Sequence, residues 1–242
     1  MIRIYHTADL HDRRGFSRRL RALQDEAPGL LADSGDALRG SQTVFRRSEP
    51  ISAEMNAAGY DVRAAGNREF HYLYACLRAR AAAMQQPLVC SNLIDLRERP
   101  LPFARSLVVE HGGTRVHFLG LLVRQYPVGS RWERLFGWRF LPPEEVVEEY
   151  ARAMKAGEML VVLSHLGLRA DRSLAQRVPR IDVILGGHSH DTLFEPEVVG
   201  GVPIVHAGPY GRYVSRTELD YDAASGRHRV RAFALVPLLG PP

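Results

Sequence analysis

Short apolar runs alternate along the chain with stretches whose apolar residues recur at helical spacing. The runs that predict strands are Ile2–His6, Gly29–Ala32, Asp61–Ala64, Pro87–Cys90, Met159–Leu163, Ile181–Leu185 and Val202–His206. The stretches that predict helices are Ser17–Glu26, Glu49–Ala58, Glu69–Met84 and Pro143–Lys155. Two hairpins are predicted, Ser106–Glu110 with Arg115–Leu122 and Val214–Tyr221 with His228–Leu235. Hairpins inserted into such an alternation indicate a mixed α/β sandwich rather than an all-parallel wound sheet.

The least periodic part of the chain is the segment Tyr126–Pro143, which carries four aromatic residues, Trp132, Phe136, Trp138 and Phe140. Such a segment either covers a site or packs as a loop, and packing is the favoured interpretation. The sequence contains no linker, repeat or low-complexity tract. We therefore predict one domain over residues 1–242.

Composition places the chain among ordinary globular proteins, with 45% hydrophobic and 24% charged residues in 242. No apolar run approaches the roughly 18 residues that a membrane helix needs. The first residues, MIRIYHTADLH, contain no apolar signal region, and Cys76 and Cys90 form no CxxC pair. These features predict a cytoplasmic protein with no membrane partner.

The formal net charge is +5, and Lys155 is the only lysine, so nearly all of the positive charge belongs to arginine. Guanidinium groups bind phosphate and carboxylate in a bidentate manner, which suits an anionic ligand. Genome composition is the favoured explanation of the bulk arginine excess. No element carries arginines interleaved with aromatic residues, so nucleic acid is an alternative partner but not the favoured one. The pattern leaves the oligomeric state open.

Polar residues that can bind metal stand just after five of the predicted strands. They are Asp9, His11, Asp36, Asn67, His165, His188 and His190. Because ligands gather at the carboxyl ends of strands in α/β sheets, we expect these five loops to converge. Seven such groups exceed the needs of one tetrahedral zinc, and they match two ions of coordination number five or six.

The motifs Asp9-Leu10-His11, Gly35-Asp36, Gly66-Asn67-Arg68-Glu69, Ser164-His165 and Gly186-Gly187-His188-Ser189-His190 resemble those of the calcineurin-like metallophosphoesterases. The stretches HTADLH, GDALRGS, GGHSHD and AGPYGRYVSRTELD are most similar to the N-terminal catalytic domain of 5′-nucleotidase-type enzymes, without their C-terminal domain. The resemblance implies an α/β fold, a four-layer α/β/β/α sandwich of two mixed sheets flanked by helices. It also implies a dinuclear metal centre.

Carried over from the family, the first metal would be held by Asp9, His11 and His190, the second by Asn67, His165 and His188, with Asp36 bridging the two. The two divalent ions would be manganese by first preference, with iron or zinc as alternatives. They would activate a bridging hydroxide that attacks a phosphate ester in line. The implied substrate is a small phosphorylated molecule, with nucleotide-derived compounds as one option.

The chain departs from the family at its catalytic histidine, because the GNHE motif reads Gly66-Asn67-Arg68-Glu69, and His71 stands where an orienting aspartate is expected. Arg68 cannot protonate a leaving group, although it can neutralise phosphoryl charge. His71, one turn further on the predicted helix, is either a substitute proton donor or a surface residue. We therefore predict a phosphoesterase that favours diesters or activated leaving groups. The alternatives are a 5′-nucleotidase-like monoesterase and a metal-binding scaffold with reduced catalysis.

Overall fold

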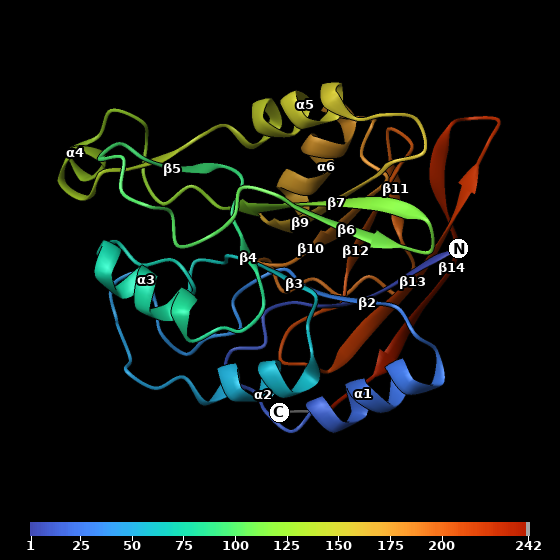
Figure 1. Ribbon diagram of the computed structural model, residues 1–242, viewed down its shortest axis with the longest axis horizontal. Helices are drawn as coiled ribbons and strands as arrows, with labels where there is room; N and C mark the ends of the chain where they lie inside the picture. The colour runs from blue at the N-terminus through green and yellow to red at the C-terminus, as the bar shows by residue number, and fades with distance from the viewer. Residues whose placement is uncertain (241–242) are drawn as a thin grey trace.

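The computed structural model describes residues 1–240 and arranges them in four layers. In Figure 1, α5 (Pro143–Ala153) and α6 (Leu168–Arg177) cover one sheet, a second sheet lies beneath it, and α1 (Ser17–Glu26), α2 (Pro50–Ala58) and α3 (Tyr74–Ala82) lie below that. This arrangement confirms the predicted four-layer α/β/β/α sandwich. Among the described residues, no helix has both the length and the apolar character that a membrane crossing requires.

The first sheet contains parallel neighbours in its centre and an antiparallel hairpin at one edge. Within the described residues its order is β14 (Arg227–Pro237), β13 (Tyr213–Asp222), β1 (Ile2–Thr7), β2 (Leu30–Asp33), β3 (Val62–Ala64) and β4 (Leu88–Val89). The strands from β1 to β4 pair in parallel, and β13 is antiparallel to both of its neighbours. The carboxyl ends of β1, β2 and β3 therefore meet at one edge.

The second sheet is also mixed. Its order within the described residues is β11 (Glu197–Val199), β12 (Val202–His206), β10 (Val183–Gly186), β9 (Met159–His165), β7 (Thr114–Leu122) and β6 (Leu107–His111). The strands β12, β10, β9 and β7 are parallel, and β11 and β6 are antiparallel edge strands. The predicted hairpins correspond to β6 with β7 and β13 with β14, and both are confirmed.

Three apolar clusters fill the spaces between the four layers. Successive side chains of a strand point to opposite faces of its sheet, so one buried strand contributes to two clusters. In β9, Val161 points into the cluster between the sheets, whereas Leu160 and Val162 point into the cluster against the helices. In β1, Ile4 faces the other sheet and Tyr5 faces α1, where its hydroxyl donates to the carbonyl of Leu23. Strands that are buried on both faces explain the continuous apolar runs of the sequence.

One predicted helix is wrong at its start. We expected a helix over Glu69–Met84, but α3 begins at Tyr74 and ends at Ala82. The Glu69 carboxylate accepts the N–H of Gly66 at 2.9 Å, and the Arg80 guanidinium donates to the carbonyls of Arg68 and Phe70 at 2.7 and 2.8 Å. These bonds hold the backbone before Tyr74 in a turn, so His71 does not lie on a helix.

Two further helices were not predicted. One is α6, whose buried residues Leu168, Leu174 and Ala175 do recur at helical spacing. The other is the short α4 (Arg131–Phe136), inside the aromatic segment Tyr126–Pro143. The same segment supplies β8 (Trp138–Phe140), which pairs with β5 (Leu93–Asp95) in a small two-stranded sheet.

Most of that aromatic segment is packed, as favoured from the sequence. Trp138 and Phe140 are fully buried, and Phe70 contacts both rings at centroid distances of 6.2 and 5.4 Å. The first half is more exposed: Val128, Trp132 and Leu135 are 53 to 58% exposed, and Trp132 stacks on Phe136. The segment therefore belongs to the core of the molecule over its second half.

A polar joint connects the two sheets just below their carboxyl ends. His6 of β1 donates from Nε2 to the Ser34 hydroxyl at 2.9 Å, and that hydroxyl donates to the Leu185 carbonyl of β10 at 2.6 Å. Ser215 of β13 donates to His6 Nδ1 at 3.4 Å. Both ring nitrogens are thus paired while the imidazole is neutral. Burial lowers the pKa of His6 to about 3.

This neutral histidine predicts a specific loss of stability in acid. As the pH falls below 6.5, His6 binds a proton in the unfolded chain, but in the folded protein it stays neutral until about pH 3. The contribution of His6 to the free energy of unfolding is therefore lost across that window. At pH 4.5 the loss amounts to about 3 kcal/mol. In urea unfolding of the metal-free protein, His6→Gln is expected to lose that much less than wild type between pH 7 and 4.5. Equal losses in the two proteins would contradict the assignment.

Candidate metal centre

The five loops that follow β1, β2, β3, β9 and β10 meet at the shared carboxyl edge of the two sheets. Loop 9–12 runs beside loop 35–37, since the N–H of Asp9 donates to the Gly35 carbonyl and the N–H of His11 donates to the Asp36 carbonyl. His165 ends β9, and the loop after β10 carries His188 and His190. The predicted convergence of these loops is therefore confirmed.

Two glycines allow loops 34–38 and 65–70 to approach each other. Gly35 has φ +95°, and a Cβ at this position would collide with the backbone of Gly66. A Cβ on Gly66 would collide with the Asp36 nitrogen and carboxylate. Neither position has room for a side chain, so the close approach depends on both glycines.

Glu69 fixes this pair of loops and was assigned no role from the sequence. Its buried carboxylate accepts the N–H groups of Asp36, Ala37 and Leu38 at 2.7 to 3.2 Å, in addition to that of Gly66. Four backbone donors around one buried carboxylate tie loops 34–38 and 65–70 together. An acidic residue directly after a Gly-Asn turn was the available signal for this role.

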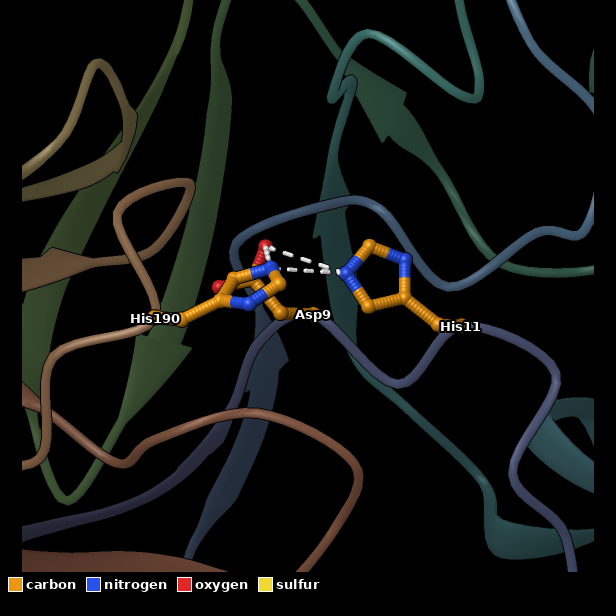
Figure 2. A group of neighbouring side chains, drawn as sticks. All are labelled: Asp9, His11 and His190. Carbon is orange, nitrogen blue, oxygen red and sulfur yellow. Dashed lines mark hydrogen bonds and ion pairs between the residues drawn. The ribbon is translucent and has the colours of Figure 1, made fainter.

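The first group of ligating atoms comes from Asp9, His11 and His190, and all of them lie within 4.8 Å of one another. The Nε2 atoms of the two imidazoles face each other at 2.9 Å, as Figure 2 shows. Asp9 Oδ1 lies 3.9 Å from His11 Nε2 and 3.7 Å from His190 Nε2. These are the three residues predicted to hold one ion.

The second group comes from Asp9, Asp36 and His165, again within 4.8 Å. His165 donates from Nδ1 to the Ser34 carbonyl at 2.8 Å, which leaves Nε2 directed at the Asp36 carboxylate at 3.3 Å and at Asn67 Oδ1 at 3.2 Å. Asp9 thus belongs to both groups, whereas Asp36 belongs to the second group alone.

His188 lies beside the second group. Its ring packs against that of His165 at a centroid distance of 5.0 Å, and its backbone N–H donates to the Asp9 carboxylate at 2.9 Å. Burial and the neighbouring His165 lower the pKa of His188, so the ring is neutral and able to bind a cation at neutral pH.

The electrostatics of the cluster favour the binding of positive charge. Burial raises the pKa of Asp9. Burial also opposes the charged form of His165, but the carboxylates of Asp36 and Asp9 outweigh it and raise the pKa of His165 to about 9. Burial disfavours ionised Asp36, yet His165 more than compensates and lowers its pKa. His11 is neutral, because burial lowers its pKa to about 4.

These residues fit divalent metal ions. His165 Nε2 and the oxygens of Asp36 and Asn67 converge within 3.3 Å, so one divalent cation could take the place of the proton that His165 holds between them. In the first group the two facing imidazole nitrogens lie beside the buried Asp9 carboxylate, so all three ligating atoms can reach one cation. The mixture of imidazole, carboxylate and amide ligands suits manganese, iron or zinc, and does not select among them.

Arg68 lies beside Asp36 of the second group. Its backbone N–H donates to Asp36 Oδ1 at 2.7 Å, and its side-chain Nε lies 3.6 Å from Asp36 Oδ2. The guanidinium also donates to the Arg39 carbonyl at 3.4 Å, and the side chain is 36% exposed. A guanidinium in this place faces both the cluster and the solvent.

His71 is turned into the protein. It is buried, its Nδ1 accepts the N–H of Leu73 at 3.0 Å, and its ring meets the edge of Phe45. Burial lowers its pKa, and the nearby Arg80 lowers it further. The ring is therefore neutral at pH 7 and belongs to neither group of ligating atoms.

Comparison with known proteins identifies the class. A family described as calcineurin-like phosphoesterase matches residues 2–192. The uncharacterized metallophosphoesterase YunD of Bacillus subtilis is 31% identical over 239 residues, which cover 92% of this chain and 50% of YunD. A 5′-nucleotidase of Vibrio cholerae is 24% identical, covering 86% of this chain and 43% of that protein.

Solved structures agree with these relatives. The 5′-nucleotidase precursor of Thermus thermophilus superimposes with a TM-score of 0.81 and 27% identity, covering 98% of this chain and 54% of that one. The chain belongs to the calcineurin-like phosphoesterase family. It spans about half the length of the curated relatives it matches.

The contact between Gly66 and Asp36 predicts the effect of one added methyl group. Gly66→Ala forces the loops apart and is expected to destabilise the protein by about 1–3 kcal/mol, as overpacking does. It should also weaken Mn²⁺ binding, because Asp36 and Asn67 shift together. Gly240→Ala is the control, since a Cβ there meets nothing within 4 Å. Thermal unfolding and Mn²⁺ titration check both effects, and wild-type values for Gly66→Ala would refute the steric argument.

Proposed function

We propose that the chain is a dinuclear metal-dependent phosphoesterase. The observation that carries this proposal is the pair of ligating groups at the shared carboxyl edge of the two sheets, each group within 4.8 Å. Membership of the calcineurin-like phosphoesterase family supports it. We further propose that residues 1–242 act as one catalytic domain, and that the location is cytoplasmic, both from the sequence pattern.

In this proposal Asp9, His11 and His190 hold one ion, Asn67, His165 and His188 hold the other, and Asp36 lies between them. Asp9 contributes to both groups, which suits a carboxylate with two oxygens. When bound, the ions supply Lewis-acid activation of water and of the phosphoryl group. Manganese is the proposed metal.

Arg68 is proposed to bind the phosphoryl oxygens of the substrate. Its guanidinium already pairs with a carboxylate beside the cluster, and its side chain is partly exposed to the solvent from which an anion enters. An arginine stabilises the growing charge of the transition state but donates no proton to the leaving group. His71, which the sequence left open as a proton donor or a surface residue, is buried, and as a donor it would have to supply the proton from a neutral ring.

Loss of a general acid shifts the preferred substrates. General acid catalysis is worth about 10²–10⁴-fold, and it matters least for leaving groups that depart as stable anions. We therefore propose a small phosphorylated substrate with an activated leaving group, or a phosphodiester. A 5′-nucleotidase-like monoesterase is the second candidate, because relatives named 5′-nucleotidase share the fold and the family match. A metal-binding scaffold without turnover is the third.

Metal binding has its own expected outcome. Wild type should bind two Mn²⁺ per chain, and at 100 times the dissociation constant each ion stabilises the fold by about 2.7 kcal/mol. His11→Ala and His165→Ala should each lower the stoichiometry toward one, because each removes a ligand of a different ion. His111→Ala, at the end of β6, serves as the control. Two bound ions in both ligand variants would contradict the assignment of ligands.

The catalytic proposal predicts a change of preference on restoring the family histidine. With Mn²⁺, wild type should hydrolyse bis(p-nitrophenyl) phosphate faster than p-nitrophenyl phosphate, and chelator should abolish both reactions. Arg68→His should raise turnover of adenosine monophosphate by about tenfold or more, since its alkoxide leaving group benefits from the general acid contribution that returns, whereas turnover of p-nitrophenyl phosphate should change little. Arg152→His, on the exposed face of α5, is the matched control.

Each outcome separates the candidates. Faster hydrolysis of adenosine monophosphate than of the aryl diester would favour the 5′-nucleotidase-like alternative. Absence of turnover in protein that carries two bound ions would favour the scaffold. An Arg68→His variant with unchanged preference would remove Arg68 from the argument.

A further inference from the structure

Tyr210 lies in the turn between β12 and β13 with a backbone conformation that is unusual for its size. Its φ is +62°, in the left-handed region that glycine adopts freely. A bulky residue held there costs about 1–3 kcal/mol. The turn is pinned from both sides, because Tyr210 N–H donates to the Asp9 carbonyl at 2.8 Å and Leu239 N–H donates to the Gly211 carbonyl at 3.0 Å. The fold thus retains a tyrosine where glycine would be unstrained.

The Tyr210 ring contacts both imidazoles of the first ligating group. Its centroid lies 5.4 Å from that of His11 and 5.7 Å from that of His190, and these two lie 4.9 Å apart. The three rings form a triangle, one side of which is the facing pair of Figure 2. The Tyr210 ring therefore packs against both imidazoles.

The two ligating groups differ in how their histidines are oriented. A histidine that binds metal is usually oriented by a hydrogen bond from its other ring nitrogen. His165 has that bond, from Nδ1 to the Ser34 carbonyl. His11 lacks it, because its Nδ1 is buried and has no hydrogen-bond partner among residues 1–240. The His190 side chain is 39% exposed and gains little constraint from packing elsewhere.

We propose that Tyr210 is a positioning residue, whose ring sets the orientation of His11 and His190 for the first metal ion by aromatic packing in place of the missing hydrogen bond. The inference rests on the proposed function, because it assumes that these imidazoles bind an ion. Ring packing fixes the side-chain torsions of both histidines before the ion arrives, so less conformational freedom is lost on binding. It also gives a reason for the strained tyrosine.

The test is Mn²⁺ affinity, measured by calorimetry and by the EPR signal of free Mn²⁺, together with the melting temperature of the metal-free protein. Tyr210→Phe keeps the ring and should bind both ions as wild type does. Tyr210→Gly and Tyr210→Leu remove the aromatic ring and should lower the affinity for one of the two Mn²⁺ ions by about 10–100-fold. This is the range seen when the hydrogen-bond partners of metal ligands are lost. Tyr213→Ala is the control, because that ring packs on Phe194 instead.

Under the proposal, Tyr210→Gly and Tyr210→Leu both bind the first ion weakly. Tyr210→Gly should nevertheless melt no lower than Tyr210→Leu, because glycine relieves the backbone strain. A merely structural role would leave the affinity for the first ion unchanged in both variants. If Tyr210→Gly does not fold, the comparison of Tyr210→Phe with Tyr210→Leu decides alone. Wild-type affinity in the leucine variant would overturn the inference and leave the proposed function intact. Failure of wild type itself to bind Mn²⁺ would instead overturn the proposed function.

Discussion

The burial of Asp9 and Asp36 side by side is the constraint on which the rest of this structure depends. Two carboxylates within a few ångströms of each other and away from water repel strongly, and neither can be neutralised by a distant surface charge. The surrounding groups reduce this repulsion. The pKa of His165 is raised, backbone N–H groups donate to both carboxylates, and the Arg68 side chain lies against Asp36. A cluster built in this way is suited to hold cations.

The loops can hold these charges together only because other parts of the chain are fixed. Gly35 and Gly66 permit a backbone approach that no other residue allows. Glu69 then ties both loops through four N–H groups, and Arg80 ties the following turn through main-chain carbonyls. Residues outside the two ligating groups, such as Gly35, Gly66 and Glu69, are therefore as constrained by their surroundings as the ligating residues themselves.

Apolar periodicity predicted a mixed α/β sandwich, and the rule that ligands gather at the carboxyl ends of strands predicted the meeting of the loops, whereas the four layers were implied by the resemblance to the calcineurin-like metallophosphoesterases. The sequence could not predict that Asp9 belongs to both ligating groups or that His188 packs on His165, because these depend on how two loops from different sheets face each other. The start of α3 failed for a related reason. Local propensity favoured a helix from Glu69, and the long-range bonds of Glu69 and Arg80 prevented it.

The joint formed by His6, Ser34 and the Leu185 carbonyl has a consequence for the whole molecule. Asp9, Asp36 and Asn67 follow strands of one sheet, whereas His165, His188 and His190 belong to the other, so the ligating groups span the seam between the sheets. Any sliding of one sheet over the other would separate the ligands. The hydrogen-bonded joint crosses the same seam just below them. These hydrogen bonds oppose sliding of the two sheets, so the spacing of the ligands depends on the buried contact between the sheets as well as on the loops.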